Sequence, residues 1–251
     1  MQKNCMGLFH TIGMYVLFMG KVFKRPEKGW IFYREVVKEI EKLGLNSIGI
    51  VAIISAFTGA VITMQTSYNI ENPFLPSYLI GVTARDTILL EFSSTIVALI
   101  LAGKVGSNIA SEIGTMRVTE QIDALEIMGV NSANHLVLPK IVGSMLFNPL
   151  LCILSIAVGI LGGWMVGLFT GIITTQNYLE GVLYAFVPYY VTYAIIKTVA
   201  FAFIITSISA FYGYHVSGGS LEVGQSSTKA VVYSSVNVLL FNVILTQLLL
   251  S

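Results

Sequence analysis

Residues 141–168 read IVGSMLFNPLLCILSIAVGILGGWMVGL, and this run contains no charged side chain. A helix of about 20 apolar residues is long enough to cross the roughly 30 Å hydrocarbon core of a bilayer. The rest of the chain is similarly apolar, because 55% of its 251 residues are hydrophobic and 11% are charged. Charged residues make up about 25% of a typical soluble domain. The sequence therefore predicts an all-α integral membrane protein.

Outside this run, four more segments have the length and composition of transmembrane helices: about 47–66, 80–104, 183–211 and 230–250. The segment 80–104 contains Arg85, Asp86 and Glu91. It can span the bilayer only if Glu91 faces protein or water. Within 141–168, Pro149 and several glycines indicate a kink and close contact between helices.

The N-terminal region, residues 1–46, differs from the transmembrane domain expected over 47–251. Residues 31–43 alternate apolar side chains with basic and acidic ones, which is typical of an amphipathic helix lying in the membrane interface. Residues 5–20 are apolar and could lie in the interface or form a sixth span. They do not resemble a signal peptide, because only Lys3 precedes them and no small-residue cleavage site follows.

Basic residues are distributed unevenly between the two sides of the predicted membrane domain. Eight precede the first span: Lys3, Lys21, Lys24, Arg25, Lys28, Arg34, Lys38 and Lys42. Three more lie in 104–140, and the loops near 67–84 and 170–181 have none. The positive-inside rule therefore places the N-terminus and the 104–140 loop in the cytoplasm. With five spans, we expect the C-terminus in the periplasm of a bacterium and the chain in its inner membrane.

The longest polar stretch lies between the second and third spans, at residues 102–129. Within it, residues 115–128 predict a short amphipathic helix, because Val118, Ile122 and Leu125 share one face while acidic residues occupy another. The pattern alone allows a solvated connector. A loop of about 35 residues is, however, more often functional than structural. An acidic face in the cytoplasm would suit a basic groove on a partner.

The sequence AGKVGS at 102–107, followed by SEIGTMRVTEQIDAL at 111–125, resembles the signature of the MlaE-type permeases of lipid-transporting ABC systems, which work with MCE-domain proteins. The resemblance covers the chain from about residue 25 to its end. It implies a homodimer of subunits that each have an N-terminal interfacial helix and five spans. It also implies that 115–128 is a coupling helix that docks into a separate ATPase, with these contact residues: Arg117, Glu120, Gln121, Asp123 and Glu126.

No catalytic, metal-binding or cofactor-binding constellation is recognisable in this sequence. The run GKVGS at 103–107 lacks the glycine and lysine spacing of a P-loop, so the resemblance implies that ATP and magnesium are bound by the partner ATPase. Cys5, Cys152 and the three histidines have no metal-ligand spacing. The charge distribution gives no indication of nucleic-acid binding.

Glu91 and Lys197 are the ionisable residues furthest inside the predicted spans. Such residues usually face a cavity or each other, so they could line a lipid cavity that receives a phospholipid headgroup, or form a structural pair. The family pattern at this point is arginine-glutamate-leucine-glycine-proline, whereas this chain has LEFSS at 90–94. Only the glutamate is shared. Arg85 and Asp86 could replace the missing arginine, although an ion pair between them is the simpler expectation.

Together with the polar stretch, the resemblance implies a permease subunit that moves phospholipid or a related lipid between the inner membrane and a periplasmic MCE-domain protein. The energy would come from the separate ATPase. A stand-alone secondary transporter or channel is the alternative, but no inverted repeat is visible and five spans do not divide into halves. A membrane-embedded enzyme is a third class, for which the sequence offers no catalytic residues.

Overall fold

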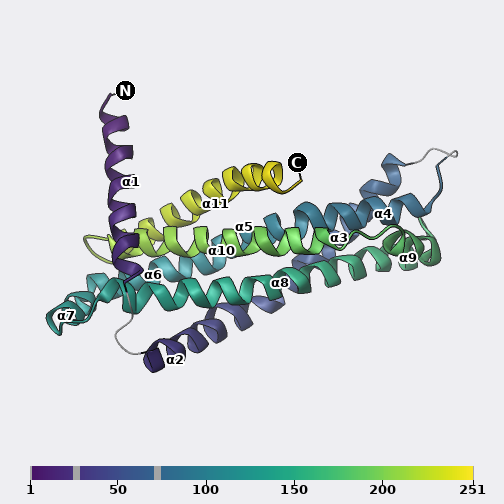
Figure 1. Cartoon of the computed structure of the whole chain (residues 1–251). Helices are drawn as coiled ribbons and strands as arrows, with labels where there is room; N and C mark the ends of the chain where they lie inside the picture. The colour runs from purple at the N-terminus through teal and green to yellow at the C-terminus, as the bar shows by residue number, and fades with distance from the viewer. Residues whose placement is uncertain (1, 25–28, 71–74, 251) are drawn as a thin grey trace. The chain divides into compact units, whose positions relative to one another are not determined.

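The computed structural model describes residues 2–24, 29–70 and 75–250, with side chains described from residue 10 onward. Lys3, Cys5, Arg25 and Lys28, which contribute to the charge distribution and cysteine content above, lie outside these residues or side chains. The described part is helical and contains no strand (Figure 1). Its α-helices are α1 (Gln2–Val22), α2 (Gly29–Glu39), α3 (Ile48–Asn69), α4 (Tyr78–Thr87), α5 (Val97–Leu101), α6 (Ser107–Val118), α7 (Gln121–Ile127), α8 (Ser132–Thr170), α9 (Thr175–Leu183), α10 (Tyr189–Tyr214) and α11 (Ser220–Leu250).

Four short segments of altered helical winding connect some of these helices without a break. Three are π-helical, namely η1 (Ile40–Gly44), η3 (Ile88–Ile96) and η4 (Ala102–Gly106), and η2 (Leu45–Ser47) is a 3₁₀-helix. As a result, α2 to α3 form one helix over Gly29–Asn69, and α4 to α6 form one helix over Tyr78–Val118. The amphipathic segment 31–43 is thus joined directly to the first predicted span, with no loop at residue 46.

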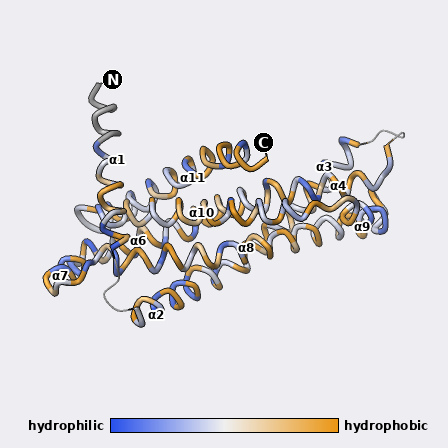
Figure 2. The backbone as a smooth tube through the Cα atoms, in the orientation of Figure 1, coloured by the Kyte–Doolittle hydropathy of each residue, from blue (hydrophilic) through white to orange (hydrophobic). Residues whose placement is uncertain are grey.

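Five helices in the described part of the chain are long and apolar enough to cross a membrane: Gly29–Asn69, Tyr78–Val118, Ser132–Thr170, Tyr189–Tyr214 and Ser220–Leu250. Long hydrophobic stretches run along α8 and α10 in Figure 2. The prediction of an all-α membrane protein with five spans is confirmed. The fourth span begins at Tyr189 and not at residue 183, because α9 ends at Leu183 and Pro188 disfavours helix in the residue before it.

The chain divides into two compact units. The first unit comprises Met1–Leu43, Leu101–Met145 and Ala202–Val238. In it, the end of α1 packs on α10, where Phe18 contacts the rings of Phe211 and Tyr214, and the Tyr15 hydroxyl donates to Ser207 over 2.8 Å. The α1 helix is therefore part of this unit.

The second unit comprises Gly44–Ile100, Leu146–Phe201 and Leu239–Ser251. In it, α3 and α8 cross so closely that a Cβ atom at Gly59 would collide with the backbone of Gly159, and one at Gly162 with the backbone of Ala56. This confirms the close helix contact expected from the glycines of α8, since small residues let helix backbones approach in a bilayer. The α8 helix continues through Pro149 without a break.

Candidate functional site

The polar stretch between the second and third spans folds as a helical hairpin, which we call the α6–α7 hairpin, and not as one helix over 115–128. The α6 helix ends at Val118, and α7 begins at Gln121. Glu120 lies between them with φ of 60°, a left-handed conformation that is unfavourable for a residue with a side chain. The prediction of a single helix over 115–128 was wrong. Apolar residues recur at helical spacing on both sides of the turn, so the sequence pattern does not show the break.

Gly114 and Gly129, which lie on either side of residues 115–128, have different roles. Gly129 adopts φ of 79° after α7 and donates its N–H to the carbonyl of Glu126, which is a typical helix C-terminus. Gly114 is instead buried inside α6, where a Cβ atom would lie 3.2 Å from Val223. Gly114 thus allows α6 to pack against α11 within the first unit.

Glu126 fixes the far end of the hairpin. Its carboxylate accepts hydrogen bonds of 2.8 Å from the hydroxyls of Tyr214 and Ser132. These bonds favour the charged form, with the Tyr214 bond contributing most, and hold the pKa of Glu126 below its usual value. On the other side of the turn, Arg117 pairs with Asp123 at 2.6 Å. The hairpin is therefore braced by its own ion pair and by the bonds of Glu126 to α8 and α10.

The remaining predicted contact residues point outward. Glu120 and Gln121 are exposed, while Ile122 is fully buried and anchors α7. Beside them, Ile127 and Met128 are 87% and 68% exposed. Exposed apolar side chains next to polar ones are typical of a surface that binds another protein. The exposure of Ile127 and Met128 was not predicted from the sequence, where only the acidic face was singled out.

In the first unit, a network of alternating positive and negative side chains connects three helical segments. Lys140 on α8 is buried and contacts Glu39 at 2.6 Å and Glu112 at 2.8 Å. Glu112 on α6 also pairs with Lys42 at 2.7 Å. Since each charge meets an opposite one, this network fixes α6 against α8 and the helix that begins at Gly29.

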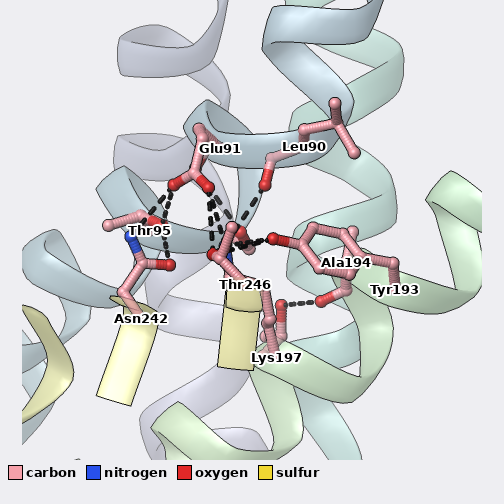
Figure 3. Close-up of polar contacts among 10 residues, drawn as sticks. Leu90, Glu91, Thr95, Tyr193, Ala194, Lys197, Asn242 and Thr246 are labelled. Carbon is pink, nitrogen blue, oxygen red and sulfur yellow. Dashed lines mark hydrogen bonds and ion pairs between the residues drawn. The ribbon is translucent and has the colours of Figure 1, made fainter. Parts of the chain in front are cut away.

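The second candidate site brings Glu91 and Lys197 together, as Figure 3 shows. The Lys197 ammonium lies 3.1 Å from the Glu91 carboxylate and donates further bonds to the Tyr193 hydroxyl and the Leu90 carbonyl. Asn242 donates to the other oxygen of Glu91 at 3.0 Å. The Lys197 side chain is fully buried, whereas that of Glu91 is 41% exposed. Of the two charges, only Glu91 can therefore touch a ligand.

Three of the partners in this cluster were not expected from the sequence: Thr95, Tyr193 and Thr246. Each stands four residues from another member of the cluster, in the pairs Glu91 and Thr95, Tyr193 and Lys197, and Asn242 and Thr246. Residues at this spacing share a helix face. The signal was therefore present in the sequence as polar pairs inside three apolar spans. Asn242 thus bonds between helices.

Arg85 does not replace the missing arginine of the family pattern. Its side chain is buried, pairs with Asp86 at 2.8 Å and donates to the carbonyls of Val182 and Tyr184 at 2.9 and 2.7 Å. The simpler expectation of an ion pair between Arg85 and Asp86 is confirmed. Within the described ranges, no group of three histidine, cysteine or acidic side chains is placed to hold a metal ion.

Comparison with known proteins matches residues 36–248 to the family model "Permease MlaE". The chain is 32% identical over 246 residues to a probable ABC transporter permease protein of Rickettsia bellii, covering 98% of this chain and 95% of that protein. It is 32% identical over 250 residues to the intermembrane phospholipid transport system permease protein MlaE of Haemophilus influenzae, with the same coverage. A chloroplastic Arabidopsis thaliana protein, TRIGALACTOSYLDIACYLGLYCEROL 1, is 30% identical over 92% of this chain and 66% of its own length.

Five apolar helices, an ordered polar hairpin between the second and third of them and a family match over most of the chain agree with one another. This chain belongs to the MlaE permease family and is a multi-pass membrane permease of the ABC transporter type.

Proposed function

We propose that this chain is the permease subunit of a bacterial inner-membrane ABC transporter that moves phospholipid between that membrane and a periplasmic MCE-domain protein. A separate ATPase that binds ATP and magnesium would supply the energy, and two copies of the chain would form the transport path. The phospholipid substrate is supported by the name of the Haemophilus influenzae relative. The observation that carries the proposal is the α6–α7 hairpin, which is held by an internal ion pair and by a bond to α10 and exposes acidic and apolar side chains.

The proposed orientation places this hairpin and the N-terminus in the cytoplasm. The basic residues near it support this, since Lys104, Arg117 and Lys140 all lie in or beside the hairpin. An ATPase docked there would contact Glu120 and Gln121 together with Ile127 and Met128. Because α6 is fixed to α8 by Lys140, movement of the docked hairpin would reach the spans directly.

A charge reversal tests this docking. Glu120→Lys changes an exposed side chain, whereas a change at Asp123 would also break its pair with Arg117. We expect Glu120→Lys to reduce co-purification of the ATPase in mild detergent at least severalfold, while the permease stays in the membrane. Glu180→Lys on α9 is the matched control, because Glu180 is also exposed but lies in the other unit. Equal ATPase recovery with both variants would contradict the docking assignment.

The lipid path is proposed to include Glu91, with Lys197 as a positioning residue that holds the Glu91 carboxylate. The exposure of Glu91 and the complete burial of Lys197 support this division of roles. A carboxylate at this depth suits the amine or hydroxyl of a lipid headgroup and requires water or protein around it. Glu91→Gln keeps the shape and removes the charge, so we expect slower lipid transfer with unchanged assembly. Wild-type transfer by this variant would make the cluster purely structural.

The contact with the MCE-domain protein is proposed to lie at the segment between α9 and α10. Leu183 at the end of α9 is exposed, as are Tyr184 and Phe186, and Arg85 holds the carbonyls of Val182 and Tyr184. Ala185 within the segment has φ of 45°, a left-handed conformation that is unfavourable for a residue with a side chain. We expect Phe186→Ser to weaken co-purification of the MCE-domain protein and to leave ATPase recovery unchanged. The reverse pattern would overturn this assignment.

A further inference from the structure

The second unit contains a small cavity on the side of η3 that faces α3 and α8. Its volume is about 10 Å³, and its polar lining consists of Ser55, Thr58, Ser93 and Ser155. A cavity of roughly this size is at the lower limit for one water molecule. It is far too small for an acyl chain or a headgroup.

One hydroxyl that lines this cavity has no partner among the described residues. Ser93 is 1% exposed, and its oxygen makes no hydrogen bond to any described residue. Several threonine hydroxyls on the spans are satisfied by the carbonyl four residues earlier, as Thr58 is by Ile54 and Thr63 by Gly59. A buried hydroxyl without such a partner is unfavourable unless something else bonds to it.

A second hydroxyl lining the cavity has a proton to donate. Ser155 on α8 is 3% exposed and accepts a hydrogen bond of 2.8 Å from Ser55 on α3. Since Ser55 supplies the proton of that bond, the proton of Ser155 needs an acceptor of its own. A water molecule requires two to four polar partners, and Ser93 and Ser155 provide two from different helices.

We infer that this cavity binds one water molecule, which bridges the Ser93 and Ser155 hydroxyls. The site makes the junction of η3, α3 and α8 a hydrated contact inside otherwise apolar spans. It satisfies Ser93 and gives the proton of Ser155 an acceptor. It is separate from the Glu91 cluster, because neither Glu91 nor Lys197 lines the cavity.

Substitution of Ser93 distinguishes a hydroxyl that is bonded to water from one that has no partner, because only the loss of a bonded hydroxyl should lower the thermal midpoint. If water bridges it, Ser93→Ala removes favourable bonds, and we expect the thermal midpoint in detergent to fall by about 2–4 °C. Ser209→Ala is the matched control. Ser209 is also fully buried and has no hydrogen-bond partner in the described part of the chain, but its oxygen packs directly against Gly106, so its removal should leave the midpoint unchanged or raise it. An unchanged or higher midpoint for Ser93→Ala would overturn the inference.

A double-mutant cycle and a density map complete the test. Ser93 and Ser155 should be coupled through the shared water, so the effect of Ser93→Ala together with Ser155→Ala should be smaller than the sum of the two single effects. Strict additivity would contradict a shared water. In a high-resolution map of the unmodified protein, a density peak within hydrogen-bond distance of both oxygens would support the site. A map with no peak there would refute it, whether or not the variants fold.

Discussion

The Glu91 cluster consists of Glu91, Lys197 and the polar side chains that bond to them. We expect the loss of Glu91 to destabilise the protein more than the loss of Lys197. Glu91→Leu would leave the Lys197 ammonium fully buried, with only neutral acceptors from Tyr193, Thr246 and the Leu90 carbonyl. Breaking a buried pair in this way costs roughly 3–5 kcal/mol. For a chain of this size, each kcal/mol corresponds to a shift of roughly 2–4 °C in the thermal midpoint. We therefore expect Glu91→Leu to lower the midpoint by roughly 6–20 °C.

Lys197→Met should be tolerated much better. Glu91 would keep its bonds from Asn242 and Thr95, and it is partly exposed. A hydrogen bond between membrane helices contributes about 0.6 kcal/mol on average, so we expect a loss of only a few degrees. The double variant, which removes both charges, should be more stable than Glu91→Leu alone.

Differential scanning fluorimetry of the purified variants in one detergent measures all three midpoints. Thr246→Val is a control that removes a neutral member of the cluster. The proposed asymmetry would be refuted if Lys197→Met were as damaging as Glu91→Leu, since the exposed part of Glu91 would then face hydrocarbon and not water or a ligand. It would also be refuted if the double variant were less stable than Glu91→Leu.

Three further predictions concern the packing of each unit. Lys140→Met should lower the thermal midpoint, because it removes the cation that Glu39 contacts and leaves Glu112 with Lys42 alone; an unchanged midpoint would refute this role for Lys140. Gly59→Val should prevent accumulation of folded protein in the membrane, since the new side chain would collide with the backbone of α8, and normal yields of monodisperse protein would contradict the crossing. The stabilisation that Glu126 provides should be fully present above pH of about 4.3 and be lost as the pH falls through its lowered folded-state pKa. The midpoint difference between the unmodified protein and Glu126→Gln should therefore disappear in acid, and a difference that grows as the pH falls would contradict a lowered pKa for Glu126.

The sequence was sufficient to predict the spans, because long charge-free runs have few alternatives to a transmembrane helix. The pairing of Glu91 with Lys197 could likewise be anticipated, since isolated charges in apolar spans need partners. The break at Glu120 could not, because the left-handed conformation depends on contacts at both ends of the hairpin.

The continuity of the long helices could not be predicted from the sequence either. A π-helical segment such as η1 changes the winding without a proline or a polar loop, so the join between the amphipathic segment and the first span leaves no mark in composition. The burial of Lys197 and the exposure of Ile127 could not be predicted from the sequence either. Each depends on which neighbouring helix covers the residue, and periodicity within one helix does not reveal that.

The α6–α7 hairpin is proposed as the docking point of a cytoplasmic ATPase, and the rest of the transport cycle depends on that contact. The most direct measurement replaces Gln121 with a photo-crosslinking amino acid in the full chain, expressed with its native membrane partners. We predict that irradiation of intact cells links this position to a protein that mass spectrometry identifies as a P-loop ATPase, while the same probe at Glu180 gives no such product. Absence of the ATPase adduct at Gln121, or an equal yield at Glu180, would contradict the docking.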